Sequence, residues 1–325
     1  MPERPDLVAT VVVATHNRSS LLPRLVAALE GQDTDSFEVV VVDDASTDDT
    51  WDALQGLAAS SKIDLRAERL AANSGPATAR NVGWRAARSA MVLFTDDDCI
   101  PQPGWVRALT GALAEVDLAQ GRTEPDPAQR THHGPFSRTL RVTAEEGYYQ
   151  TCNIGYRRTV LDALGGFDER YRHPAGEDTD LGWRARESGA ATRFVDDGVV
   201  YHDVRPSRFL VHLRDTWRWG SCVLTVKQHP GLRDLIWRRV FLRGTHPPAL
   251  LGGAGLLIAA VPAFGVGRWA GVVLLLPYLD LRIRRWPLQG GPRRRIAAIP
   301  GAFVADLAES LVMVISSVRY RTLVL

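Results

Sequence analysis

The sequence reads Phe37-Glu38-Val39-Val40-Val41-Val42-Asp43-Asp44 close to its N-terminus. A short run of β-branched residues that ends in acidic residues is typical of a buried parallel strand. Two further runs have the same character, Leu7 to Ala14 and Met91 to Thr95, and the second of these is followed by Asp96-Asp97-Asp98. Because ligands bind at the carboxyl ends of strands in open α/β sheets, we expect these acidic residues to mark one site.

Helical patterns separate these strands. Ser20 to Gly31 carries an apolar stripe, Asp48 to Ala59 opens after a Ser-Thr pair, and Pro76 to Ala87 begins with proline. This alternation predicts βαβ units, and therefore a mainly parallel, Rossmann-like α/β sheet that is flanked by helices. The other elements expected in this region are a helix over Pro103 to Glu115, an irregular segment to about Tyr149, structure over Tyr149 to Tyr156, helices over Thr159 to Leu164 and Thr179 to Ser188, and a strand over Val199 to His202.

The composition is that of a globular protein. The 325 residues are 45% apolar and 23% charged, which excludes a disordered or fibrous chain. A formal charge of +2 is too even to indicate nucleic-acid binding across the whole molecule. Cys99, Cys152 and Cys222 have no metal-ligand spacing and the first apolar run is too short for a signal peptide, so we expect a reducing compartment. No Gly-x-Gly-x-x-Gly follows the first strand and no P-loop is present, which argues against a dehydrogenase and an NTPase.

The last third of the chain has a different character. Arg205 to Arg243 holds nine basic and two acidic residues with interleaved tryptophans, which indicates a basic amphipathic surface facing membrane lipid. Ala249 to Val266 has no charged residue and Trp269 to Leu279 is a second apolar stretch, so we expect a membrane hairpin. A buried helical pair of a soluble domain is the alternative. Six arginines follow between residues 282 and 295, and the positive-inside rule places them on the cytoplasmic side with the catalytic part.

A last apolar stretch, Ile296 to Val318, contains Asp306 and Glu309. A carboxylate is costly in lipid, so we expect this stretch to be amphipathic or buried against the hairpin. The predicted division is a catalytic domain over residues 1–204, a basic juxtamembrane segment over 205–248, and C-terminal membrane-associated helices over 249–325.

The acidic clusters indicate a positively charged ligand. Carboxylates do not gather at one sheet edge for stability, because like charges repel and burial adds a desolvation cost. Asp96 and Asp98 offer hard oxygen ligands at alternate positions, the type that Mg²⁺ or Mn²⁺ uses when it also binds substrate phosphates. A divalent metal is therefore the expected cofactor.

With these motifs the sequence resembles the family 2 nucleotide-sugar glycosyltransferases, which have the GT-A fold and invert the anomeric centre. The resemblance covers Leu7 to about His202, some 60% of the chain, and rests on five matches in order. They are Val11-Val12-Val13-Ala14-Thr15-His16-Asn17-Arg18, Val42-Asp43-Asp44-Ala45-Ser46-Thr47-Asp48, Asn73-Ser74-Gly75-Pro76 through Arg80-Asn81-Val82-Gly83, Phe94-Thr95-Asp96-Asp97-Asp98, and Gly165-Gly166-Phe167-Asp168 followed by Gly176-Glu177-Asp178.

The resemblance implies roles for these residues. Asp44 would bind the nucleobase, Arg80 would face the diphosphate, Asp96 would hold the ribose or a metal-bound water, and Asp98 would hold the metal. The remaining residues expected around the donor are Thr15, Asn17, Arg18, Asp43, Asn73, Gly75 and Asp97. His202 matches a metal-binding histidine of some members, although a structural histidine explains it as well.

The Glu177-Asp178 pair resembles the family's catalytic acids, and Asp178 would remove the proton of the acceptor hydroxyl. We expect the dipole of the following helix to keep its pKa low. Direct attack with one base gives inversion. We expect acceptor selection around Asn153, and Trp183 could stack on an acceptor sugar, although a core position explains this tryptophan as well.

The chain lacks a full Gln-x-x-Arg-Trp box, with only Arg218-Trp219 present, which argues against a processive synthase. The leading hypothesis is a transferase of single sugars from a UDP, GDP or dTDP donor to a glycan or lipid-linked hydroxyl acceptor, at the cytoplasmic face of the cell membrane. Transfer to polyprenyl phosphate, a non-catalytic nucleotide-sugar-binding protein and a nucleotidyltransferase are the alternatives; no nucleic-acid partner is expected.

Overall fold

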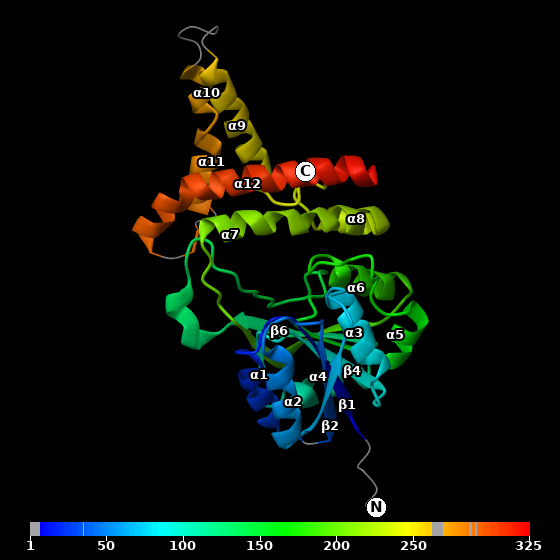
Figure 1. The fold of residues 1–325 in the computed structure, drawn as a ribbon. Coiled ribbons are helices and arrows are strands. Elements are labelled where there is room, and N and C mark those ends of the chain that lie inside the picture. The colour runs from blue at the N-terminus through cyan, green and yellow to red at the C-terminus, as the bar shows by residue number, and fades with distance from the viewer. Residues whose placement is uncertain (1–6, 35, 262–268, 286–287, 290) are drawn as a thin grey trace, which may run out of the picture. The chain divides into compact units, whose positions relative to one another are not determined.

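A computed structural model describes residues 7–34, 36–261, 269–285, 288–289 and 291–325 (Figure 1). These residues form two compact units. One contains the described residues up to Ala128 together with Thr139–Asp203, and the other contains Gln129–Arg138 and Val204–Leu325. The predicted separation of residues 205–248 from 249–325 stays a prediction.

An eight-stranded sheet organises the first unit, with the strand order β3-β2-β1-β4-β7-β6-β8-β5. The strands are β1 (Ala9–Thr15), β2 (Phe37–Asp43), β3 (Asp64–Arg69), β4 (Met91–Thr95), β5 (Cys99–Pro101), β6 (Leu118–Pro125), β7 (Asn153–Arg157) and β8 (Thr192–His202).

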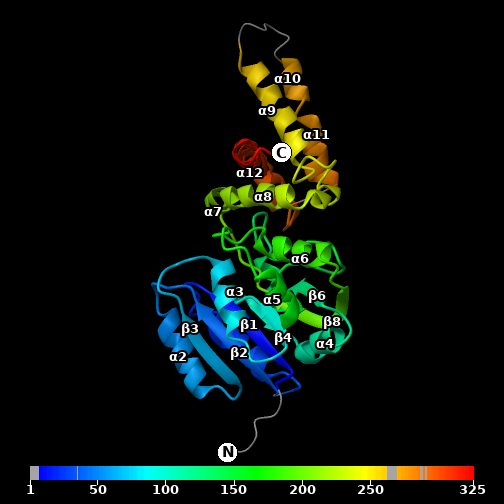
Figure 2. The same cartoon turned by 90° about the vertical axis from the view of Figure 1, so that its right-hand side faces the viewer.

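One half of the sheet is parallel, because β1 pairs in parallel with both β2 and β4, and β2 pairs in parallel with β3. Apolar side chains cover both faces of this half, as the continuous valine runs predict. Helices α1 (Leu22–Glu30), α2 (Thr50–Ser60) and α4 (Trp105–Leu113) pack on one face, and α3 (Pro76–Arg85) packs on the other (Figure 2). The predicted α/β sheet flanked by helices is confirmed.

The other half of the sheet is mixed. Strand β7 pairs antiparallel with β4 and β6, β8 pairs parallel with β6, and β5 pairs antiparallel with β8. The predicted irregular region after α4 is wrong for β6, since Leu118–Pro125 is a strand at the centre of this half. The predicted strand over Val199 to His202 is the end of the longer β8.

The pairing of β6 with β8 contains an irregularity. Gly121 lies opposite Val195 but Thr123 lies opposite Val200, so β8 carries extra residues at this point. The amide of Asn153 holds the bulged segment, because its Nδ2 donates to the Gly198 carbonyl oxygen at 2.8 Å. Beyond the bulge, β8 is paired on both sides, to β6 and to β5. The remaining helices of this unit are α5 (Arg158–Leu164) and α6 (Glu177–Glu187).

The second unit is helical in its described part. A 29-residue helix, α12 (Pro292–Tyr320), is the one described helix whose length and apolar composition would allow it to cross a membrane. The predicted apolar stretches form α9 (His246–Ala260), α10 (Ala270–Val273) and α11 (Leu276–Asp280), and residues 262–266 of the first stretch lie outside the described residues. The other helical segments are η1 (Pro127–His132), α7 (Phe209–Arg214), η2 (Asp215–Gly220), α8 (Ser221–Gln228), η3 (Pro230–Asp234) and η5 (Leu281–Arg285).

Candidate active site

The predicted acidic residues follow the carboxyl ends of β2 and β4, and β1 lies between these strands. Thr15, the last residue of β1, contacts both acidic groups. Its hydroxyl donates to Oδ2 of Asp97 at 2.8 Å, and its carbonyl oxygen accepts the backbone N–H of Asp44 at 2.8 Å. The two acidic clusters therefore meet at one edge of the sheet.

The carboxylate of Asp44 is held by the loop that precedes α3. Its two oxygens accept the backbone N–H groups of Ser74 and Gly75 at 2.7 and 2.8 Å. Gly75 has φ of +91°, a conformation that side chains disfavour, and an added Cβ would lie 2.3 Å from the Arg172 carbonyl oxygen. The amide nitrogen of Asn73 lies 3.1 Å from Nε2 of His16, after β1. The loop before α3 thus brings together three residues that were predicted to bind the donor: Asp44, Asn73 and Gly75.

Other predicted donor residues shape the turns around this loop. Asp43 is fully buried, accepts the Ser46 backbone N–H at 3.1 Å and pairs with Arg69 at 3.2 Å. Asn17 adopts a φ of +53° and its side-chain oxygen accepts the Thr47 backbone N–H at 2.9 Å. The Arg18 backbone N–H donates to the Thr50 hydroxyl at 2.8 Å. Asp43 and Asn17 therefore stabilise the turns around the loop through these contacts.

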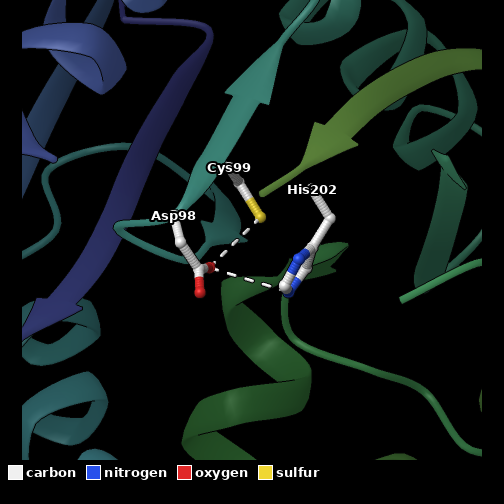
Figure 3. Close-up of side chains that lie close together, drawn as sticks. All are labelled: Asp98, Cys99 and His202. Atoms are coloured by element: carbon white, nitrogen blue, oxygen red, sulfur yellow. Dashed lines mark hydrogen bonds and ion pairs between the residues drawn. The ribbon is translucent and has the colours of Figure 1, made fainter. Parts of the chain in front are cut away.

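The third acidic residue of the Asp96-Asp97-Asp98 run faces a histidine (Figure 3). Cys99 in β5 lies opposite His202 in β8, and this register brings Nε2 of His202 to 3.7 Å from Oδ1 of Asp98. Nδ1 of His202 is 2.9 Å from the Asp203 carbonyl oxygen. A carbonyl oxygen can only accept, so this contact places a proton on Nδ1 and leaves Nε2 facing Asp98.

Asp98 and His202 fit a divalent metal. A carboxylate oxygen and a neutral imidazole nitrogen are both ligands that Mn²⁺ accepts. The Cys99 thiol is the third group of this cluster, which sequence reasoning missed. Burial raises the pKa of Cys99 well above its usual value, so the thiol stays protonated, and it lies 3.9 Å from Asp98. Sulfur is a soft ligand, whereas Mg²⁺ and Mn²⁺ prefer carboxylate oxygens, so Asp98 and His202 remain as the candidate ligands.

Arg80 joins the Asp96-Asp97-Asp98 loop to the acidic pair Glu177-Asp178 at the start of α6. It is 5% exposed, and its two terminal nitrogens donate to Oδ1 of Asp96 at 2.8 Å and to Oε1 of Glu177 at 2.9 Å. The two carboxylates raise the pKa of Arg80 despite its burial. Arg80 thus bridges two acids in this structure, and its contact with a diphosphate stays a prediction. Oε2 of Glu177 has no hydrogen-bond partner among the described residues.

Asp178 is half-buried next to Glu177, and its Oδ1 accepts the Thr179 backbone N–H at 2.8 Å. Burial, followed by the charge of Glu177, raises the pKa of Asp178 to about 7. The prediction that the helix dipole keeps this pKa low is wrong, because desolvation and a like charge outweigh the dipole. A pKa near neutrality suits a general base.

Asp97 has a similar environment. Burial, and then the neighbouring charge of Asp98, raises its pKa to about 7, against the hydrogen bond from Thr15. Two carboxyl groups at this edge therefore resist ionisation, as expected for groups that a bound cation would stabilise.

The two residues predicted to touch the acceptor are both buried. Asn153 is fully buried; its Oδ1 accepts the Trp105 indole N–H at 2.8 Å, and its Nδ2 donates to the carbonyls of Arg122 and Gly198. It is a structural amide rather than an acceptor ligand. The Trp183 indole N–H donates to the Gly147 carbonyl at 2.8 Å and its ring is largely buried, which agrees with the core alternative.

Sequence reasoning also missed the role of Asn81, the residue after Arg80. Its Oδ1 accepts the Phe167 backbone N–H and its Nδ2 donates to the Phe167 carbonyl, both at 2.9 Å. This pair of bonds ties α3 to the Gly165-Gly166-Phe167-Asp168 turn. Both segments carry the family resemblance, but they lie far apart in the sequence, so their contact was not predicted.

Residues 10–165 match the model of glycosyl transferase family 2. Residues 10–165 are therefore a family 2 glycosyltransferase domain. A "Pre-mycofactocin glycosyltransferase" of Mycobacterium tuberculosis H37Rv is 29% identical over 285 residues, covering 82% of this chain and 55% of that protein. A "Chondroitin synthase" of Pasteurella multocida is 28% identical over 250 residues, or 64% of this chain and 26% of that one. The chain thus spans about half or less of the length of these curated relatives.

Solved structures support the GT-A type of fold for this chain. The mannosyltransferase PcManGT from Pyrobaculum calidifontis, in complex with GDP-Man and Mn²⁺, superimposes with a TM-score of 0.64 at 21% identity, over 95% of this chain and 87% of that one. S. aureus TarS 1-349 in complex with UDP gives a TM-score of 0.50 at 21% identity, over 97% and 92%. The predicted fold class is confirmed.

Proposed function

We propose that this family 2 protein is an inverting glycosyltransferase that moves a single sugar from a nucleotide-diphosphate sugar to a hydroxyl acceptor. The observation that carries the proposal is a set of contacts between acidic segments: Thr15 contacts Asp44 and Asp97, and Arg80 contacts Asp96 and Glu177. Asp98 and Asp178 are the chain neighbours of Asp97 and Glu177, which supports one shared site for Asp44, Asp98 and Asp178. Arg80 compensates Asp96 and Glu177, and a bound divalent cation would offset the repulsion among the remaining acids while it holds the phosphates of a ligand.

The donor would bind with its base at Asp44 and its diphosphate near the Asp96-Asp97-Asp98 loop. The Asp44 carboxylate is already fixed by two N–H groups, so its position does not depend on the ligand. The solved structures of similar fold contain GDP-Man or UDP. Sugars carried by UDP, GDP or dTDP are all candidate donors for this chain.

Asp98 and His202 would hold Mg²⁺ or Mn²⁺, and Asp96 would contribute through a water or the ribose. A bound divalent cation would supply charge neutralisation for the departing nucleoside diphosphate. The support is the chemistry of these side chains and the orientation of His202, whose Nε2 faces Asp98.

Asp178 would act as the base. Its ionised carboxylate takes the proton of the acceptor hydroxyl while that oxygen forms a bond to the anomeric carbon. The bond from that carbon to the phosphate oxygen breaks in the same displacement, and its electron pair leaves with the nucleoside diphosphate. One displacement from the opposite face inverts the anomeric configuration. Glu177, fixed by Arg80, would support the position of Asp178.

The second unit motivates the proposed setting. Its apolar helices and arginines support a location at the cytoplasmic face of the cell membrane and a glycan or lipid-linked acceptor of the cell envelope. Polyprenyl phosphate is the alternative acceptor. Its oxygen is already ionised, so transfer to it would depend less on Asp178.

The test uses the purified full chain with UDP-, GDP- and dTDP-sugars, with sugar and polyprenyl-phosphate acceptors, and with or without Mn²⁺. We expect metal-dependent transfer with inverted product, lost in Asp98→Ala and reduced about 10²–10⁴-fold in Asp178→Asn. Asp162→Asn is the matched control, since Asp162 lies on α5 with a side chain 56% exposed. Full activity of both site variants, or donor binding without turnover on any acceptor, would contradict the proposal.

A further inference from the structure

Two helical segments in the second unit cross at glycines. An added Cβ on Gly255 of α9 would lie 2.1 Å from the Gly271 carbonyl oxygen, and one on Gly271 of α10 would lie 2.3 Å from the Gly255 carbonyl oxygen. The two backbones therefore touch. Close backbone packing through glycine is how helices associate in lipid, where apolar side chains provide no hydrophobic driving force between them.

The surface of this pair is apolar on its open sides. Residues 249–261 and 269–279 contain no charged side chain. Leu257 is 72% exposed and Trp269 is 63% exposed. The other large apolar side chains exposed on the pair are Leu250, Leu251, Leu256, Ile258, Val261, Val272, Val273 and Leu276. A contiguous apolar patch of this kind indicates a hydrophobic partner.

Charged groups gather where the pair meets α12. The Asp306 carboxylate accepts the Tyr278 hydroxyl at 2.6 Å and the Thr245 hydroxyl at 3.1 Å, and it pairs with Arg282. Glu309 pairs with Arg243 at 2.7 Å. Both acids of α12 are thus compensated, and both lie at the end of the hairpin that is near residues 245 and 278–282.

Helix α12 runs across the hairpin rather than along it. Figure 1 shows α12 lengthwise and α9 upright, and in Figure 2 α12 is seen end-on while α9 remains upright. One bilayer normal cannot be parallel to both. The acids of α12 are costly in a hydrocarbon layer, whereas residues 249–261 and 269–279 of the hairpin carry no charge, so the bilayer normal follows the hairpin. The exposed side of α12 is an apolar stripe of Val304, Leu311, Ile315 and Val318, as in helices that lie in a membrane surface.

Arginines mark the level of the headgroups. Arg284 and Arg285, which follow α11, have side chains 80% and 76% exposed, and Arg293 and Arg294 begin α12 in exposed positions. They lie at the same end of the hairpin as the Asp306 and Glu309 pairs. Cations at that level complement anionic phospholipid headgroups.

We infer that α9 with α10 and α11 is the segment that enters the bilayer, and that α12 lies in the headgroup layer, although among the described helices α12 is the one long and apolar enough to cross. This inference rests on the proposed membrane location and specifies which surface contacts an anionic phospholipid bilayer. The apolar hairpin enters the acyl chains, and the Asp306 and Glu309 pairs stay in contact with the headgroup region.

The test places an environment-sensitive fluorophore at Leu257→Cys on α9 or Ile315→Cys on α12, in the full chain with Cys222→Ser. Both replaced side chains are exposed, at 72% and 59%. The protein is added to vesicles of equal parts phosphatidylcholine and phosphatidylglycerol that carry a quencher either in the headgroup or at the middle of the acyl chain. We expect mid-chain lipid to quench the label at 257 more strongly, and headgroup lipid to quench the label at 315 more strongly.

A second measurement is vesicle co-sedimentation of Leu257→Asp and of its matched control Ile315→Asp, each checked by circular dichroism for folding. We expect Leu257→Asp to weaken partitioning about tenfold or more and Ile315→Asp to weaken it less. Deep quenching at 315 with a water-exposed label at 257 would overturn the inference but leave membrane location intact. No binding of the unmodified chain to these vesicles would overturn both, and neither result depends on sugar transfer.

Discussion

Asp178 illustrates how a position in the fold sets the chemistry of one side chain. Only its ionised form can accept a proton, and its raised pKa of about 7 means that ionisation is completed above neutrality. We therefore expect kcat/KM to rise about tenfold per pH unit below about pH 6 and to level off above about pH 8. A pH-rate profile of the full chain measures this, and a profile that is flat through this range would contradict the assignment.

The same pKa predicts a stability effect of known sign. A folded-state pKa above the usual 3.8 means that the folded protein holds this proton more tightly than the unfolded chain does. The contribution of Asp178 to the free energy of unfolding is therefore full at low pH and declines as pH rises from about 4 to about 7. Urea unfolding of the metal-free protein should show this decline, and Asp178→Asn should reduce it.

Arg80 is a second residue whose surroundings predict a measurable effect, in this case on stability. Its removal in Arg80→Gln leaves Asp96 and Glu177 without their bridging cation, so we expect a loss of about 3–5 kcal/mol in the free energy of unfolding. Urea denaturation measures it. Arg85→Gln, on the same helix with a side chain 52% exposed, is the control and should change stability by less than about 0.5 kcal/mol. Equal effects of the two variants would show that the bridge is not formed.

These residues also show what the sequence could and could not predict. The acidic residues were found because each follows a recognisable strand or begins a helix, and the fold brings such positions to one edge. The partners of Arg80 were not found, because Glu177 lies 97 positions away in the chain. Asn153 was misassigned for the same reason, since its three partners come from distant segments.

Among the secondary-structure elements, the loop before α3 offers a sharp comparison between two glycines. Gly75→Ala forces a side chain into a φ of +91° and against the Arg172 carbonyl, so we expect a loss of more than about 1 kcal/mol and weaker donor binding. Gly56→Ala is the matched control, because nothing lies within 4 Å of its added Cβ and α2 is a regular helix there. It should stabilise the protein by about 0.4–1 kcal/mol. Thermal unfolding and donor titration of both variants measure the difference.

Strands were predicted unevenly, for a physical reason. The buried strands β1, β2 and β4 are apolar on both faces and stand out in the sequence. Strand β3 was missed because its side chains are half-exposed and mostly charged, and β6 was missed because polar Gln120 and Thr123 are buried within it. Backbone pairing, rather than side-chain pattern, makes these segments strands, and pairing partners cannot be read from a local window.

For the whole molecule, the shared edge of the sheet predicts coupling between two ligands. Mn²⁺ and a nucleoside diphosphate should each raise the melting temperature, and together they should raise it by more than the sum of the two shifts. Asp98→Ala should remove the metal-dependent part and keep a nucleotide-dependent part, since Asp44 is unchanged. Thermal shift with UDP, GDP and dTDP measures this. Additive shifts in the unmodified protein would mean that the two ligands bind apart.

The two units differ in how far the sequence predicted them. The first was predicted through its motifs, because strand ends and loop residues recur in a fixed order. In the second, the apolar stretches were found, but their crossing at Gly255 and Gly271 and the pairing of Asp306 with Arg282 depend on tertiary contacts. A hydropathy pattern gives the number of apolar segments and not the direction in which each one runs.

The bulge in β8 determines where this chain can change length. Between Val200 and His202 the strand is paired on both edges, so losing or gaining one residue there would turn the His202 ring to the opposite face of the sheet and away from Asp98. Around Asp196 to Gly198 the register already slips, and a residue gained or lost there can be absorbed. We therefore expect changes in strand length to be tolerated at the bulge and not between Val200 and His202, where they would move the imidazole.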